Sequence, residues 1–228
     1  CLVGSEMCIR DSYPAEGLVE HDPEEIWRSV FETTKSLMAK NEVKSEDIIS
    51  IGITNQRETV MLWDNKGKVL YKAIVWQDRR TAKYCEELKA KGLEKIITEK
   101  TGLLLDPYFS ASKARWLINK HKVDPKKYFF GTIDTFLVWK LTQGKAFVTD
   151  ITNASRTSLL NIDLGIWDEE LLDIFELRGL NLPEVTKNAS DFGTTKIFGG
   201  KIRISGVAGD QQASLIGQGC FSQGQVKS

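Results

Sequence analysis

Four groups of side chains in this 228-residue sequence have the chemistry of a binding or catalytic site. They are Arg57 with Glu58, then Trp76, then Tyr108, and finally Asp210 with Gln211. An arginine donates a fixed fork of hydrogen bonds, carboxylates accept hydrogen bonds from hydroxyls, and aromatic rings cover a carbon chain. Together these residue types are suited to a small polyol.

Asp210 is the residue whose position most favours catalysis. The sequence around it predicts a strand with Ile202 and Ile204, a glycine-bracketed turn at 206–209, and a helix whose first turn carries Asp210. A carboxylate at the carboxyl end of a strand points into the crevice where open α/β sheets bind ligands. Asp210 is therefore a candidate general base. The alternative is that it caps the helix by accepting hydrogen bonds from the amides that follow.

Arg57 and Glu58 can share a ligand only under one geometric condition. Adjacent residues of a regular strand point to opposite faces, so the chain must bend between them. The polar insert 54–59, which separates two apolar strands, permits such a bend. The alternative is a solvated charge pair that contributes about 0 to 1 kcal/mol. For each of the two aromatic residues, the alternative is packing in a partly buried position.

The elements that must position these residues alternate between strands and helices, which predicts an α/β architecture. Asp22 and Pro23 begin a helix that ends near Asn41, with Glu25 completing a start that resembles a capping box. Its apolar stripe is expected to face the core. The other predicted helices are 79–91, 93–100, one that opens at 110, 135–142 capped by Asp134, and 169–177 capped by Asp168. The remaining predicted strands are 49–53, a hairpin of 60–63 with 69–76, 129–133 and 149–162.

Composition excludes several classes of function. The 41% apolar and 27% charged content is that of a soluble globular protein, and 31 basic residues balance 31 acidic ones. This balance gives no electrostatic case for nucleic acid or an anionic membrane as the main partner. No apolar run is long enough to span a bilayer. The four cysteines lack the spacing of a zinc site or a disulfide framework, which favours a reducing, cytoplasmic location.

Common nucleotide-binding motifs are absent from this sequence. Neither the Gly-x-Gly-x-x-Gly fingerprint nor a P-loop occurs, and the two histidines are not in a metalloprotease setting. Residues 1–12 show no periodicity and are interpreted as a segment that is not native protein, which leaves 13–228 as one domain.

Seven motifs, in order from Tyr13 to about Gly224, resemble the FGGY carbohydrate kinases, and within that family those that phosphorylate glycerol. The matching segments are Tyr13-Pro14 with 19–23, 52–59, 74–81, 101–103 with 106–110, 131–135, 149–150 with 152–157, and 206–213. The resemblance implies a ribonuclease H-like fold of the actin/hexokinase ATPase type, with two large domains and a deep cleft.

The resemblance also implies an activity and roles for single residues. The activity is ATP-dependent phosphorylation of glycerol to sn-glycerol 3-phosphate with Mg²⁺, by a homo-oligomeric complete protein. The residues that match the family's polyol-binding positions are Arg57, Glu58, Trp76, Tyr108, Asp210 and Gln211. Asp210 matches the general base near the metal, a role suited to phosphoryl transfer because that reaction needs an oriented nucleophile and charge neutralisation.

The sequence departs from the family pattern at both ends. The family opens with an Asp-x-Gly-Thr-Thr-Ser-like phosphate loop where this sequence has residues 1–12, and it continues into a second, adenosine-binding domain after the point where this sequence stops. We therefore expect a truncated N-terminal, polyol-binding domain that turns over no ATP by itself and whose nucleotide-binding residues are unknown. The alternatives are a pentulose or gluconate kinase of the same family, or a non-catalytic polyol-binding fragment.

Overall fold

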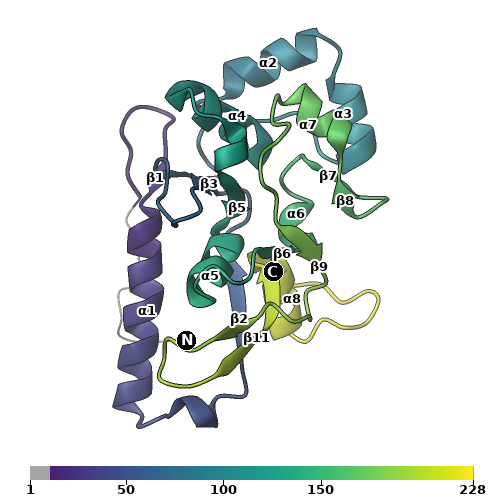
Figure 1. Ribbon diagram of the computed structural model, residues 1–228. Helices are drawn as coiled ribbons and strands as arrows, with labels where there is room; N and C mark the ends of the chain where they lie inside the picture. The colour runs from purple at the N-terminus through teal and green to yellow at the C-terminus, as the bar shows by residue number, and fades with distance from the viewer. Residues whose placement is uncertain (1–10, 228) are drawn as a thin grey trace.

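The computed structural model describes residues 11–227, which form a mixed α/β fold (Figure 1). The segment 1–12, which we interpret as non-native, lies outside this range except for its last two residues. Of these, Ser12 forms an isolated antiparallel bridge with Glu20. Within the described range, none of the helices combines the length and the apolarity that a membrane-spanning helix requires.

Eight α-helices and eleven strands are assigned in residues 11–227. The helices are α1 Pro23–Lys40, α2 Ala82–Ala90, α3 Glu94–Thr101, α4 Ser110–His121, α5 Ile133–Leu141, α6 Ile151–Ala154, α7 Glu169–Ile174 and α8 Asp210–Gly217. The strands are β1 Glu20–His21, β2 Ser50–Asn55, β3 Val60–Trp63, β4 Ala73–Ile74, β5 Phe129–Thr132, β6 Val148–Asp150, β7 Leu160–Asn161, β8 Ile166–Trp167, β9 Glu184–Thr186, β10 Thr194–Thr195 and β11 Ile202–Gly209.

Strand β3 lies at the centre of a four-stranded sheet of order β1-β4-β3-β5. All four of its residues are buried, and successive side chains enter two different cores because a strand alternates its faces. Val60 and Leu62 pack with the cluster that α2, α3, α4 and α7 cover, in the upper part of Figure 1. Met61 and Trp63 pack with α1 and α5 on the other face.

A second sheet, of order β10-β11-β2, carries the residues of interest. Strands β11 and β2 are parallel, with Gly209 opposite Asn55 at their carboxyl ends. Both strands therefore end at the same edge of the sheet. After β11 the chain enters α8, and after β2 it enters the segment with Arg57 and Glu58. This pairing confirms the expectation that Asp210 follows a strand at its carboxyl end.

Helix α5 lies between the two sheets and is buried almost all round, as the sequence predicts. Its start differs from the prediction. Asp134 does not cap the helix, because the N-cap position is Thr132 and Asp134 lies in the first turn, fully buried. The carboxylate instead accepts hydrogen bonds from the hydroxyls of Thr132, at 2.5 Å, and Thr149, at 2.7 Å.

Helix α1 has the predicted start and end but a different environment. The Asp22 side chain accepts a hydrogen bond from the amide of Glu24, and Asn41 is the C-cap. Only Pro23 and Ile26 of the helix are buried, however, and Leu37 is exposed. The helix lies along the side of the molecule, so only its N-terminal half packs into the core and the core-facing prediction is wrong for the rest (Figure 1).

Two other predictions are corrected. The segment 149–162 is not one strand: it divides into the end of β6, helix α6 and strand β7. Its β-branched residues favour a strand, but the Asp150 side chain accepts a hydrogen bond from the amide of Thr152 and so begins a helix. Residues 206–209 are not a turn, because β11 continues through both glycines up to the start of α8.

Candidate polyol site

Arg57 and Asp210 meet where β2 and β11 end. The Nε atom of Arg57 lies 3.5 Å from Oδ1 of Asp210. The Arg57 side chain is 12% exposed and its Nε atom is buried without a hydrogen bond, whereas the Asp210 side chain is 50% exposed. A buried guanidinium nitrogen without a partner is costly, so this position favours a further acceptor on a ligand.

Asp210 combines features of both interpretations that the sequence leaves open. Its Oδ1 atom accepts a hydrogen bond of 2.8 Å from the amide of Gln211, which is partial capping of α8. The N-cap position itself is Gly209, with no side-chain hydrogen bond. The second carboxylate oxygen accepts no hydrogen bond from the residues that the structure describes. It is therefore available to a hydroxyl or a metal ion.

Gly209 permits the close approach of Arg57. A Cβ atom at this position would lie 2.3 Å from Cδ and 2.7 Å from Cγ of the Arg57 side chain. Since Arg57 is packed at the sheet edge, the added methyl group must displace it from Asp210.

We expect Gly209→Ala to weaken polyol binding about 10- to 100-fold, because small displacements of a binding group carry penalties of this size. The binding constant of glycerol, measured by calorimetry on the complete protein, checks this. Gly217→Ala, at the far end of α8, is the control for glycine replacement, since nothing lies within 4 Å of that Cβ position and its φ is outside the left-handed region. Unchanged glycerol binding in Gly209→Ala would show that the position of the Arg57 side chain does not affect binding.

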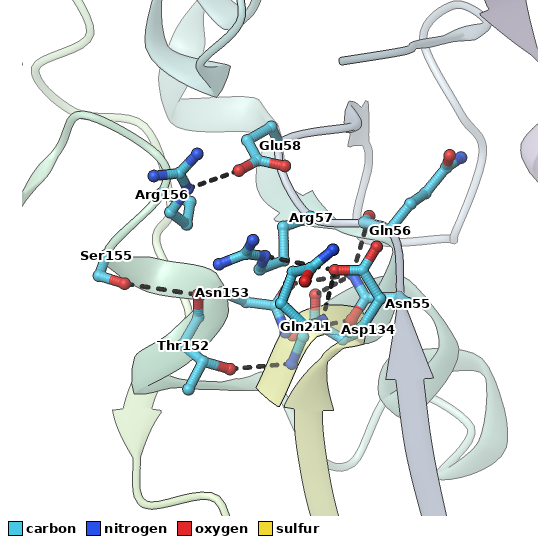
Figure 2. Close-up of polar contacts among 12 residues, drawn as sticks. Asn55, Gln56, Arg57, Glu58, Asp134, Thr152, Asn153, Ser155, Arg156 and Gln211 are labelled. Carbon is cyan, nitrogen blue, oxygen red and sulfur yellow. Dashed lines mark hydrogen bonds and ion pairs between the residues drawn. The ribbon is translucent and has the colours of Figure 1, made fainter. Parts of the chain in front are cut away.

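The backbone at Glu58 provides the bend that lets Arg57 and Glu58 face one site. Glu58 has a φ of 63°, in the left-handed region, and the amide of Thr59 donates to the carbonyl of Arg57 at 2.7 Å. The carboxylate of Glu58 is buried, and burial raises its pKa. Arg156 opposes that effect through a hydrogen-bonded ion pair of 2.6 Å (Figure 2). The ion pair with Arg156 therefore stabilises the buried carboxylate of Glu58, which can accept hydrogen bonds from hydroxyls.

Trp76 and Tyr108 form an aromatic wall beside this pair. Their ring centroids are 5.4 Å apart at 57°, and the Arg156 guanidinium lies 5.6 Å from the Tyr108 ring centroid. Hydrogen bonds between side-chain hydroxyls and the backbone connect the segments that carry the wall to the segment of Glu58. The amide of Trp76 donates to the Thr59 hydroxyl, and the Ser110 hydroxyl donates to the carbonyl of Glu58 at 3.0 Å. Both rings are partly buried, so packing against the protein explains part of the position of each ring.

A buried polar network supports the site from below (Figure 2). The Asn55 amide donates to Asn153 at 3.0 Å and to Asp134 at 3.3 Å. Burial, followed by the nearby charge of Asp150, raises the pKa of Asp134 to about 6. The Thr152 hydroxyl accepts a hydrogen bond of 2.9 Å from the amide of Gly209, which ties α6 to the end of β11. The network therefore fixes the strand ends that carry Arg57 and Asp210.

Gln211 is the least integrated of the residues that the sequence singles out. It is exposed, and its side-chain oxygen accepts a hydrogen bond of 2.7 Å from Lys227. The structure brings the other five together through the contacts described above, and Gln211 joins them as the neighbour of Asp210.

Arg156 is the main site residue that the sequence did not single out. It lies in the segment 149–162, which the sequence predicts as a strand, so the direction of the Arg156 side chain was not predictable. One signal was available: an arginine amid short polar and β-branched residues requires an acidic partner wherever it is buried. The partner, Glu58, is 98 positions away.

No cluster of three or more histidine, cysteine, aspartate or glutamate side chains within residues 11–227 is arranged to hold a metal ion. Mg²⁺ ordinarily uses one or two carboxylates together with water and substrate phosphates. The exposed carboxylate of Asp210 fits that pattern.

Comparisons with known proteins identify the family. A profile described as the FGGY family of carbohydrate kinases, N-terminal domain, matches residues 4–217. The chain belongs to the FGGY family of carbohydrate kinases. It is 54% identical to a glycerol kinase of Sinorhizobium fredii over 95% of this chain and 45% of that one. The chain thus spans about half the length of the curated FGGY relatives it matches.

Solved FGGY structures agree with the fold. The crystal structure of Plasmodium falciparum glycerol kinase with ADP has a TM-score of 0.87 and 39% identity, over 94% of this chain and 45% of that one. A gluconate kinase from Lactobacillus acidophilus has a TM-score of 0.80 and 25% identity, over 90% of this chain and 42% of that one. The expected ribonuclease H-like fold is confirmed, and the resemblance to glycerol kinases is greater than that to other FGGY enzymes.

Proposed function

We propose that the complete protein containing this chain phosphorylates glycerol with ATP to give sn-glycerol 3-phosphate, and that this chain supplies the polyol site. The observation that carries the proposal is the convergence of Arg57, Asp210 and the Glu58–Arg156 pair beside the aromatic wall. The ion-pair distances are 3.5 Å for Arg57–Asp210 and 2.6 Å for Glu58–Arg156. The 54% identity to a glycerol kinase supports glycerol as the substrate.

In this proposal each residue has a role that its geometry allows. Arg57 donates to a glycerol oxygen, and Glu58, paired with Arg156, accepts from a hydroxyl. Trp76 and Tyr108 cover the carbon chain. Asp210 accepts the proton of the attacking hydroxyl through its open oxygen, as a general base within hydrogen-bond reach does. Gln211 adds a polar contact at the start of α8.

ATP and Mg²⁺ are part of the same proposal. Asp210 is the residue that would hold Mg²⁺, and the ion would supply charge neutralisation at the reacting phosphates when bound. We propose that the complete protein binds ATP through residues outside 13–228, and a solved relative whose structure contains ADP supports nucleotide binding itself. The family resemblance further supports a cytoplasmic, homo-oligomeric complete protein without a nucleic-acid partner.

A substrate panel tests the function. Purified complete protein is supplied with ATP, Mg²⁺ and either glycerol, xylulose or gluconate, and ADP release is followed. We expect kcat/KM for glycerol to exceed that for the other two by at least about 10³-fold, because a site built to pair hydroxyls rejects mismatched ligands strongly. Preference for xylulose or gluconate would assign another FGGY activity, and no turnover with any of them would support a non-catalytic binding role.

A further inference from the structure

Lys113 of α4 is a charged side chain in the core. It is 0% exposed, whereas lysine is almost never fully buried unless it is paired. Among residues 11–227, no carboxylate forms an ion pair with it within 4.0 Å. Its ammonium instead donates hydrogen bonds to two backbone carbonyls, those of Tyr108 and Phe109, the second at 3.2 Å.

This burial carries a free-energy cost. Desolvation lowers the pKa of Lys113 to about 7, while the negative charges of Asp78 and Glu58 act in the opposite direction. An apolar side chain of similar volume would avoid the desolvation penalty, but it would leave the two carbonyls without this donor. The two effects on global stability oppose each other, so a stability gain by itself does not explain a lysine here.

The two carbonyls belong to the turn that carries the aromatic wall. Asp106 holds the same turn by accepting a hydrogen bond of 2.8 Å from the amide of Tyr108. On the side-chain face, the Arg156 guanidinium lies 4.9 Å from the ring centroid of Phe109 and also contacts the Tyr108 ring. Lys113 binds the remaining polar face of the turn, its carbonyls, from inside the core. The direction of the Tyr108 ring toward Trp76 thus depends on a contact made beneath it.

We propose that Lys113 is a positioning residue for the polyol site, which fixes the Tyr108–Phe109 turn and so places the Tyr108 ring against Trp76. Lys113 does not touch the substrate in this account and acts only through the turn. The inference rests on the proposed function, because the effect of Lys113 is measured through the binding of glycerol.

The test uses Lys113→Met in the complete protein, with Lys100→Met as the matched control. Lys100 binds Asp168 and Glu170 away from the site. We expect Lys113→Met to raise KM for glycerol on the order of 10- to 100-fold, the scale of a misplaced binding group. The kcat, the KM for ATP and the thermal midpoint should stay close to wild type. Lys100→Met should leave KM for glycerol unchanged.

A second measurement separates positioning from a general structural role. If Lys113 acts through Tyr108, Lys113→Met should add no further increase in KM for glycerol to a Tyr108→Ala variant, since the two changes affect one interaction. Independent, multiplying effects would overturn the inference. Should Lys113→Met fail to fold, Lys113→Gln, which retains a donor, takes its place in the same comparison.

The outcomes distinguish this inference from the function on which it rests. Wild-type protein that does not phosphorylate glycerol contradicts the proposed function. Wild-type protein that is active, together with a Lys113→Met variant of unchanged KM for glycerol, contradicts only the role of Lys113. A lowered thermal midpoint with unchanged KM would show that Lys113 is purely structural.

Discussion

Asp210→Asn in the complete protein is expected to lower kcat for glycerol phosphorylation by about 10²–10⁴-fold, the usual contribution of a general base. Asparagine has nearly the same shape and still accepts a hydrogen bond from the amide of Gln211, so α8 should keep its start. The neutral amide cannot take the proton of the attacking hydroxyl. Because one ion-pair partner of Arg57 is also lost, a modest increase in KM for glycerol accompanies the effect.

The measurement is ADP release under saturating ATP and glycerol, with Asp163→Asn as the control. Asp163 is an exposed aspartate between β7 and β8, remote from the site. It should leave kcat unchanged. If Asp210→Asn kept more than about a tenth of wild-type kcat, Asp210 would be a binding or capping residue rather than the base.

Arg156→Ala is expected to have the second largest effect, because it leaves the Glu58 carboxylate buried and unpaired. The Glu58 side chain is only 3% exposed, and loss of one partner from a buried ion pair costs on the order of 3 kcal/mol. We expect a lower thermal midpoint and weaker glycerol binding together. The double variant Glu58→Gln with Arg156→Ala should recover most of the thermal stability, though not the binding, because no buried charge remains.

The same variants predict a pH dependence. Burial raises the pKa of Glu58 above 4.5, its usual value, so the folded state binds this proton more tightly than the unfolded state. The contribution of Glu58 to the free energy of unfolding therefore falls as pH rises from the unfolded pKa through the folded one. Loss of Arg156 raises the folded pKa further and extends this fall to higher pH.

Thermal midpoints measured from about pH 4 to about pH 8 check the sign. Arg156→Ala should lose more stability with rising pH than wild type, and the double variant should lose less than Arg156→Ala. If the thermal midpoints of all three proteins changed with pH in parallel, Arg156 would not affect the pKa of Glu58 as the structure indicates.

Helix boundaries were largely predictable because the signals that set them are local. Asp22 and Asp168 each accept an amide hydrogen bond at the start of a helix, as their positions in the sequence indicate. The α4 start at Ser110 was also predicted. The error at 149–162 arose where two local signals conflict, since β-branched composition favours a strand and Asp150 favours a helix start.

The candidate site was predictable only in part because its assembly depends on contacts between distant segments. Residue type identified Arg57, Glu58 and Asp210, but only the parallel pairing of β2 with β11 brings Arg57 and Asp210 together. The roles of Arg156, which pairs with Glu58, and of Lys113, which binds the Tyr108–Phe109 turn, could be recognised only from the tertiary structure. Lys113 did leave one sign: it is four residues before Leu117 on the buried stripe of its helix, where a charge is unusual.

The most direct test of the account is a crystal structure of the complete protein with glycerol and a non-hydrolysable ATP analogue, prepared without glycerol as cryoprotectant. We predict that the glycerol hydroxyls contact Arg57, Glu58 and Asp210, with the carbon chain against Trp76 and Tyr108. Glycerol bound elsewhere, or with Asp210 beyond hydrogen-bond reach of any hydroxyl, would contradict the assignment of this site.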